Sequence, residues 1–407
     1  MLSPYRALDL TDEKGFLCGK ILGDLGADVV KIEPPGGHPA RNAPPFYDDH
    51  PDPEKSLAWL AYNTSKRGIT LDVESSRGRE LFERLVGTAD FVIESFAPGY
   101  MEGLGLGYSS LRRLNPRVVM TSITPFGQAG PYRDFEAGDL VANAMGGLMF
   151  ICGDPDRPPV RISAPQSYCH AGVQAAAGTL MAHYQREYTG ESQYVDVSMR
   201  EAVLWTLTYA TEYWHTSRHV FSRAGTQWRA FDTAYRVVLP CKDGYVAYRL
   251  GFGRMLGDDF VNFVRAMDSE GMAGELKEVD WPSQSVIQKQ VDIERWEAIM
   301  ISYLTKYTKK ELHEKALEWD FMLYPVNDPK DIFEYRQLAS RDYWVEVEHP
   351  ELDTAIAYPG AFFKSSETSW GISRRAPLIG EHNRELYQDE LGLSEQELHS
   401  LSADGVV

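Results

Sequence analysis

Apolar positions near the start of the chain alternate between short continuous runs and helical spacing. Residues 5–10 form a run typical of a strand, and apolar residues from Leu17 to Leu25 then recur at three- and four-residue steps, as on one face of a helix. Gly26 can end that helix, and residues 28–32 form a second strand-like run. Strand, helix and strand in so short a span predict a parallel βαβ unit.

The same alternation continues to about residue 197. The runs predict strands at 90–93, 117–120 and 193–197, and helices at 79–85, 111–114 and 170–187. The strands are short and apolar, which is typical of a parallel sheet buried on both faces. The pattern therefore predicts a doubly wound α/β domain, a fold whose ligands usually lie at the carboxyl ends of the strands.

From about Thr226 the pattern changes to that of a smaller mixed domain. Two strand-like runs flank a turn that contains Asp243-Gly244, which predicts a hairpin over residues 235–248. Charged helices are expected at 292–306 and 309–318. Near the end of the chain, Ser394 and Glu397 have capping-box spacing and predict a helix over 394–401.

The composition argues against several kinds of partner. The 407 residues carry a formal charge of −18, from 41 Lys+Arg against 59 Asp+Glu; a nucleic-acid partner is not expected, because phosphate contacts need clustered basic residues. No apolar run approaches the ~20 residues of a transmembrane helix, and the first residues lack the pattern of a secretory signal. Four scattered cysteines favour a reducing cytoplasm over a disulfide framework.

Standard catalytic signatures are missing from the sequence. It contains no GxxxxGK[ST], HExxH, CxxC or GxSxG pattern, and we expect no bound metal ion. Cys169 and His170 are adjacent in an expected helix, where consecutive side chains point about 100° apart. They are therefore not expected to form a thiol–imidazole dyad.

Six segments occur in an order that indicates a family resemblance. They are Leu8–Thr11, Gly23–Glu33, Asn63–Asp72, Phe126–Tyr132, Thr189–Ser198 and Gly380–His382. The ordered set resembles the family III CoA-transferases, a group that includes formyl-CoA transferase, carnitine CoA-transferase and α-methylacyl-CoA racemase. One segment alone would be weak, but the set in this order is highly specific.

The resemblance implies an unusual architecture. Residues 1–222 and 330–407 would form a Rossmann-like large domain built from both termini, and residues 223–329 a smaller mixed α/β domain. Two such chains would interlock as a dimer of rings. The resemblance also implies that coenzyme A or an acyl-CoA binds as a substrate and that no cofactor is permanently bound.

The family's CoA pocket can be carried over position by position. The family arginine near the adenosine end falls on Arg41, and the leucine that touches the nucleotide falls on Leu71. The family's Asn-Phe pair becomes Ser95-Phe96, so the aromatic contact remains while the amide is lost. The plainer alternatives are a solvated surface charge for Arg41 and core packing for Phe96.

Other positions near the expected site match the family pattern less closely. Lys66 and Arg67 could screen the 3′-phosphate of CoA, although a solvated turn explains them nearly as well. The glutamine–alanine pair that lines the site in formyl-CoA transferase is replaced by Glu13-Lys14. Residues 251–253 lie roughly where the family has a mobile glycine loop, but the match is loose.

The family reaction depends on an aspartate. This residue attacks the acyl-CoA thioester to give a mixed anhydride, and CoA is then held as an aspartyl thioester while the acids exchange. Counting back from the segment that begins at Thr189, the position falls on Tyr168, and its neighbours Ser167 and Cys169 are not acids either. A tyrosine hydroxyl has no acyl carbon that could hold sulfur, so the covalent relay cannot run here by the family route.

Two explanations remain open. In one, the chain is a non-catalytic subunit, and a homologous aspartate-bearing partner supplies the carboxylate. In the other, a displaced carboxylate acts, and the nearest in sequence are Asp139, Asp154 and Asp156. We favour the first, because residues 154–156 have the pattern of a plain turn and Asp139 falls at a position that is often acidic in catalytically ordinary members. Residues 165–172 resemble the aspartate-lacking subunit of two-subunit members from anaerobic toluene degradation, which move CoA between succinyl-CoA and a dicarboxylic acid such as (R)-benzylsuccinate. An acyl-CoA racemase and a CoA-ester binding module are further alternatives.

Overall fold

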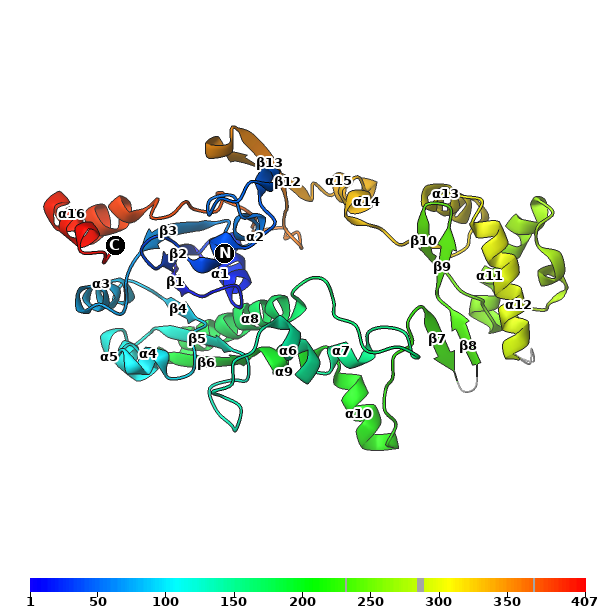
Figure 1. The fold of residues 1–407 in the computed structure, drawn as a ribbon, viewed down its shortest axis with the longest axis horizontal. Coiled ribbons are helices and arrows are strands. Elements are labelled where there is room, and N and C mark those ends of the chain that lie inside the picture. Colours follow the sequence, from blue (N-terminus) through cyan, green and yellow to red (C-terminus); the bar gives the residue numbers. More distant parts are fainter. Residues whose placement is uncertain (231–232, 284–288, 369) are drawn as a thin grey trace. The chain divides into compact units, whose positions relative to one another are not determined.

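The structure is a computed structural model that describes residues 1–230, 233–283, 289–368 and 370–407 (Figure 1). The chain divides into two compact units. The first comprises Met1–Met149, Arg161–Val220 and Gln337–Val407, and the second comprises Phe150–Val160 and Phe221–Arg336. Both termini therefore belong to the first unit.

A six-stranded parallel sheet organises the first unit. Its strands are β1 (Arg6–Leu10), β2 (Asp28–Glu33), β3 (Lys66–Thr70), β4 (Phe91–Glu94), β5 (Val119–Thr124) and β6 (Gln193–Ser198). Their order is β3-β2-β1-β4-β5-β6, and every neighbouring pair is parallel. The order reverses between β1 and β4, as in doubly wound folds, and the predicted fold class is confirmed.

Alternate side chains of these strands enter two different cores. Leu8 and Val92 pack in one cluster together with α3 (Ser76–Val86), while Ala7 and Phe91 pack in another together with α8 (Gln166–Thr189). A strand that is buried on both faces carries few polar residues. This double burial explains why short apolar runs marked β1, β2, β4 and β5 in the sequence.

The sequence pattern missed β3, and the alternative of a solvated turn at Lys66 and Arg67 is wrong. Both residues are buried and begin this edge strand of the sheet. The C-terminal segment covers the edge: the N–H of Thr70 donates to Asn383 Oδ1 (2.9 Å), and the hydroxyl of Tyr387 donates to the Thr70 carbonyl (2.7 Å). A covered edge leaves fewer open hydrogen-bonding groups for another chain to pair with.

Helix α8 packs closely against α1 (Phe16–Asp24). A Cβ added to Gly172 would lie 2.8 Å from the Cβ of Leu17, so the glycine permits this close approach. The helix begins at Gln166, four residues before its predicted start, and ends at Thr189, followed by the C-cap Gly190, whose φ of 72° suits a residue without Cβ.

The other elements of the first unit are short. The helices are α2 (Leu57–Tyr62), α4 (Tyr100–Gly103), α5 (Tyr108–Leu114), α6 (Asp139–Met145), α9 (Met199–Trp205), α10 (Thr208–Ser217) and α16 (Glu395–Ala403), and the hairpin strands are β12 (Trp344–His349) and β13 (Thr354–Pro359). Single helical turns are η1 (Pro39–Asn42), η2 (Tyr47–Asp49), η4 (Pro350–Leu352) and η5 (Glu385–Glu390). The predicted capping box of Ser394 and Glu397 is confirmed at the start of α16.

The second unit combines short antiparallel strands with helices. Its strands are β7 (Gln227–Ala230), β8 (Thr233–Arg236), β9 (Val238–Cys241), β10 (Gly244–Ala247) and β11 (Tyr324–Pro325). Its helices are α11 (Gly253–Ser269), η3 (Gly274–Glu278), α12 (Gln290–Leu304), α13 (Lys309–Trp319) and α14 (Pro329–Phe333), while α7 (Leu148–Ile151) and α15 (Arg336–Ser340) lie where the chain passes between units. Within the described ranges, no helix has both the length and the apolar character needed to cross a membrane.

The predicted hairpin in the second unit is confirmed at its turn and corrected in its first strand. β9 and β10 pair antiparallel around Lys242 and Asp243. The run expected at 235–239 is divided, because the N–H of Val237 donates to the Thr226 carbonyl (2.9 Å) and residues before it pair with β7 instead.

Candidate functional site

A crevice of about 470 Å³ opens at the carboxyl ends of β1, β2, β3 and β4. It lies where the strand order reverses, which is the usual ligand position in an open α/β sheet. Two residues of the expected CoA pocket, Leu71 and Phe96, line it. Phe96 packs on the core and stacks on the Tyr100 ring, with centroids 4.5 Å apart. The side chain therefore belongs to the core on one side and lines the crevice on the other.

Ser95 ties the end of β4 to the loop that follows β1. Its hydroxyl donates to Asp12 Oδ1 (2.8 Å) and accepts the N–H of Asp12 (2.8 Å). The same carboxylate forms an ion pair with Lys14. Ser95, which the resemblance matches to the family's asparagine, therefore connects two loops at the entrance of the crevice.

Arg41 lies behind the crevice wall and is fully buried, so the alternative of a solvated surface charge is wrong. Its Nε and Nη2 donate to the two oxygens of Glu33 (2.6 and 2.7 Å), and its Nη1 donates to Glu54 (2.6 Å). The guanidinium also lies 3.8 Å from the ring centroid of Trp59. Such a bidentate pair fixes Glu33 at the end of β2.

Lys66 belongs to a buried network of three charges. Its Nζ lies 2.8 Å from Asp9 Oδ2, and Lys31 Nζ lies 3.2 Å from Asp9 Oδ1. Burial alone would raise the pKa of Asp9, but the two ammonium groups hold it well below its usual value. Burial lowers the pKa of Lys66 to about 8, although Asp9 opposes the change.

Arg67 fastens the C-terminal segment to the sheet. Its Nε donates to Asp28 (2.9 Å), and its Nη1 donates to Glu385 (2.7 Å) and Glu390 (2.6 Å). Arg41, Lys66 and Arg67 are thus all engaged by carboxylates of the chain itself. Their contact with CoA stays a prediction, and in this structure none of the three lines the crevice.

Tyr168, the residue that counting in the sequence matches to the family nucleophile, lines a second cavity of about 220 Å³. The walls are mainly apolar and aromatic and include Phe16, Trp59, Tyr62 and Cys169. The Tyr168 hydroxyl accepts the N–H of Asp139 (3.3 Å), and burial raises the pKa of Tyr168. The Cys169 thiol lies 3.8 Å from the Tyr62 hydroxyl.

Of the displaced carboxylates named from the sequence, Asp139 lies beside Tyr168. Asp139 begins α6, and its Oδ1 accepts hydrogen bonds from the N–H (2.9 Å) and hydroxyl (2.8 Å) of Ser167. Asp154 and Asp156 are exposed and belong to the second unit. Neither is among the described residues that line the cavity.

Glu13 is a carboxylate at this cavity that sequence reasoning missed. It lines the wall beside Tyr168, and its charge contributes to the raised pKa of that tyrosine. The signal was present in the sequence, because Glu13 is half of the Glu13-Lys14 pair that departs from the family pattern.

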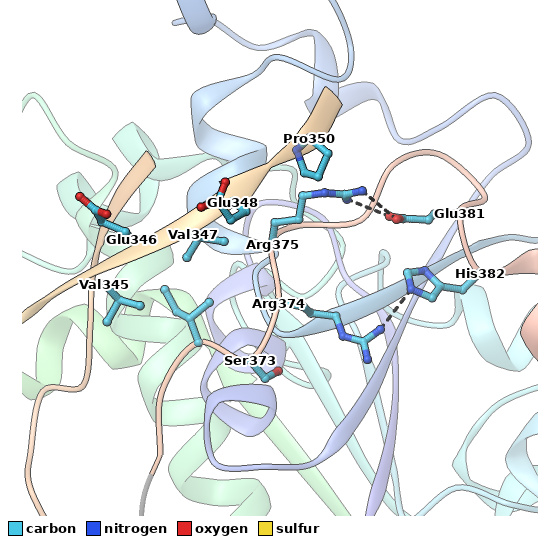
Figure 2. A pocket seen from close by; sticks show the side chains of 11 residues that line it. Val345, Glu346, Val347, Glu348, Pro350, Ser373, Arg374, Arg375, Glu381 and His382 are labelled. Carbon is cyan, nitrogen blue, oxygen red and sulfur yellow. Dashed lines mark hydrogen bonds and ion pairs between the residues drawn. The ribbon is translucent and has the colours of Figure 1, made fainter. Parts of the chain in front are cut away.

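A larger hollow of about 570 Å³ lies beside β12 in the first unit, and none of the predicted site residues lines it (Figure 2). Arg375 points across it to Glu381, to which it donates two hydrogen bonds (2.8 and 2.9 Å), and Arg374 contacts His382. The Arg375 pair closes the turn that leads into the C-terminal segment. Across the described parts of the chain, no three His, Cys, Asp or Glu side chains are placed to hold a metal ion.

Comparisons with known proteins agree with this geometry. A family model described as CoA-transferase family III matches residues 3–383. The chain is 35% identical to the succinyl-CoA:(R)-benzylsuccinate CoA-transferase subunit BbsE of Thauera aromatica, over 100% of this chain and 98% of that one, and 32% identical to a formyl-CoA:oxalate CoA-transferase of Streptomyces avermitilis, over 100% and 99%. A crystal structure of a CAIB/BAIF family protein from Brucella suis matches with a TM-score of 0.82 at 26% identity, over 95% of this chain and 98% of that one. The chain belongs to CoA-transferase family III.

Proposed function

We propose that this chain is the non-catalytic subunit of a family III CoA-transferase that moves CoA between succinyl-CoA and a dicarboxylic acid such as (R)-benzylsuccinate. A homologous subunit that bears the aspartate would hold the covalent intermediates. The observation that carries the proposal is that the residue matched by counting to the family nucleophile is a tyrosine, Tyr168, which lines the second cavity. The substrate pair is supported by the name of the Thauera aromatica relative, which is itself called a subunit.

The chemistry of Tyr168 does not suit the family reaction. The relay needs a carboxylate, because only an acyl carbon can accept the CoA thiolate and become a thioester. Burial raises the pKa of the Tyr168 hydroxyl, so it stays protonated at neutral pH. If it were acylated, the product would be an aryl ester, and attack by the thiolate would only return acyl-CoA.

The surface of the first unit suits a partner subunit. Large apolar side chains on α8, α9 and α10 are mostly exposed in the single chain, among them Met181 (70%), Tyr188 (74%) and Trp205 (69%). Exposed aromatic and methionine side chains are enriched at protein–protein contacts. We extend the proposal to the family's interlocked dimer, with the aspartate-bearing subunit as the second ring, in the reducing cytoplasm that four free cysteines suit.

A second candidate function rests on one observation. Glu13 lines the same cavity as Tyr168 and could act as a displaced carboxylate in a transferase made of this chain alone. Glu13 sits in an exposed position on the loop before α1. A side chain held only by an exposed loop is less well preorganised for covalent catalysis than one on α8.

The experiment compares this chain alone, the aspartate-bearing subunit alone and the two together in a succinyl-CoA exchange assay. We expect exchange only from the pair, and no hydroxylamine-sensitive CoA adduct on this chain. In the pair, Tyr168→Phe and Glu13→Gln should each leave the rate within about twofold, because neither supplies the nucleophile. Exchange by this chain alone, or a CoA adduct on it, would refute the proposal, and loss of that activity in Glu13→Gln would establish the second candidate.

A further inference from the structure

The crevice at the carboxyl ends of β1–β4 has an unexpected charge for a CoA site. Its walls include the carboxylates of Asp12, Glu33, Asp72 and Glu74, and no lysine or arginine is among the described residues that line it. CoA carries a 3′-phosphate and a diphosphate. Proteins usually hold such groups with arginine, lysine or backbone N–H groups.

The basic side chains next to the crevice are engaged by other groups of the chain: Arg79 Nη1 donates to the Glu74 carbonyl (2.6 Å), and two others pair with carboxylates. Lys14 pairs with Asp12, and the buried Arg41 pairs with Glu33. A swing of the guanidinium into the crevice would leave Glu33 buried and unpaired, which is strongly unfavourable. His38 also lines the crevice, but burial and the nearby Lys31 ammonium lower the pKa of His38 to about 4, so the ring is neutral at pH 7.

Asp72 and Glu74 leave a net negative charge at the rim. Asp72 Oδ1 accepts the N–H of Glu74 (2.9 Å), and Glu74 Oε1 accepts the hydroxyl of Tyr100 (2.7 Å). Within the described parts of the chain, neither carboxylate has an ion-pair partner. Their effect is visible at Tyr100, whose pKa is raised to about 12 by burial and by these two neighbours.

The remaining walls suit a flat, uncharged ring. Leu10, Ile32 and Leu71 supply apolar surface, and the stacked rings of Phe96 and Tyr100 supply an aromatic face. Carboxylate oxygens are strong acceptors for hydroxyl and amino groups. A volume of about 470 Å³ falls within the ~300–1,000 Å³ range of small-molecule sites.

We propose that this crevice binds an uncharged nucleoside-like ligand, a flat ring system with hydroxyl or amino donors, and rejects phosphate-bearing ligands, CoA among them. The inference rests on the proposed function, because it assigns the working CoA site of the complex to the aspartate-bearing subunit. The chain studied here keeps the position and the aromatic wall of a nucleotide site but lacks the positive charge that phosphates need.

Calorimetric titration of the full-length chain with adenosine, 3′-dephospho-CoA and CoA tests the inference. We expect adenosine to bind at least tenfold more tightly than CoA at low ionic strength, with 3′-dephospho-CoA between them. The difference in affinity between adenosine and CoA should narrow in ~0.5 M salt, because mobile ions screen the repulsion between the carboxylates and the phosphates.

Charge-reversal variants test whether the Glu74 carboxylate causes the expected preference for adenosine over CoA. Glu74→Lys should raise CoA affinity roughly tenfold, from two charge units acting over about 6 Å in water, and change adenosine affinity much less. Tyr100→Phe removes the hydrogen bond to Glu74 but leaves the negative charge of Glu74 in place, so CoA affinity should not rise. Glu83→Lys makes the same charge change at an exposed position on α3 and should alter neither affinity.

Three results would overturn the inference: CoA binding more tightly than adenosine, no detectable adenosine binding, or equal gains in CoA affinity from Glu74→Lys and Glu83→Lys. The exchange assay of the assembled pair keeps this outcome separate from the proposed function. Tight CoA binding by this chain in an active pair would defeat only the inference. Exchange by this chain alone would defeat the proposed function, whatever the crevice binds.

Discussion

Glu94, the last residue of β4, is a carboxylate whose ionisation should weaken the fold. It is 3% exposed, and its Oε2 accepts the N–H of Phe96 (2.7 Å). Burial raises the pKa of Glu94 from 4.5 to about 7, although hydrogen bonds from Ser122 and Phe96 favour the ionised form. The folded chain therefore prefers Glu94 as the neutral acid.

The resulting loss of stability accumulates as the pH rises. Between pH 4.5 and about 7 the unfolded chain has released the Glu94 proton while the folded chain retains it, so the free energy of unfolding falls with increasing pH. Each pKa unit corresponds to about 1.4 kcal/mol. The shift from 4.5 to about 7 therefore costs about 3 kcal/mol, which is fully felt above pH 7 and absent below pH 4.5.

The variant Glu94→Gln keeps the shape and polarity of the side chain but cannot ionise. We expect its free energy of unfolding, relative to the parent, to rise by about 3 kcal/mol between pH 4.5 and pH 7.5. Urea unfolding monitored by hydrogen exchange of β4 and β5 peptides measures this, because it reports on the first unit even if the second unfolds separately. Glu83→Gln, at an exposed position, should show no such trend. A pH-independent difference between Glu94→Gln and the parent would refute the reasoning.

Three further substitutions test the packing around the site. Arg41→Met leaves the buried Glu33 carboxylate without its guanidinium and should lower the free energy of unfolding by about 3–5 kcal/mol, measured by urea denaturation. Gly19→Ala would place a Cβ 2.1 Å from Asp9 Oδ2, so the ion pairs of Asp9 must shift, and a loss of about 1–3 kcal/mol is expected in the same assay. Ser394→Ala removes the N-cap of α16 and should cost about 1 kcal/mol, seen as faster hydrogen exchange in that helix.

Each of these variants has a matched control in the first unit. Arg112→Met removes a guanidinium from an exposed position on α5, Gly103→Ala adds a Cβ that would meet nothing within 4 Å, and Ser400→Ala truncates an exposed serine inside α16. We expect each control to change stability by less than about 0.5 kcal/mol. A control as damaging as its partner variant would show that the named contact is not the cause.

The strands of the sheet could be predicted where a few consecutive apolar residues indicate burial on both faces. β1, β2, β4 and β5 are apolar because both of their faces meet a core, and this burial is visible in a few consecutive residues. β3 begins with Lys66 and Arg67 and therefore looks polar. Their burial depends on Asp9 and Glu385, which lie 57 and 318 residues away in sequence, and no local pattern reports such partners.

The site was predictable to the same extent. The count from the segment at Thr189 back to Tyr168 runs along one uninterrupted helix, α8, and the match of Tyr168 to the family nucleophile stays a prediction. Arg41 follows a Gly- and Pro-rich stretch and looks like a surface charge. In the structure it is enclosed by Glu33, Trp59 and the Pro377 carbonyl, and the last of these comes from the opposite end of the chain.

The surroundings of Tyr168 carry several negative charges. After burial, the carboxylates of Glu13, Asp12 and Asp139 are the influences that raise the pKa of Tyr168. An aspartate in the same place would meet the same negative field, which would raise its pKa, while the Asp139 N–H that binds the Tyr168 hydroxyl would oppose the change. A neutral hydroxyl tolerates this field, whereas an anionic nucleophile would be destabilised by it. The carboxylates around Tyr168 therefore favour an uncharged side chain at this position, as the proposed non-catalytic role requires.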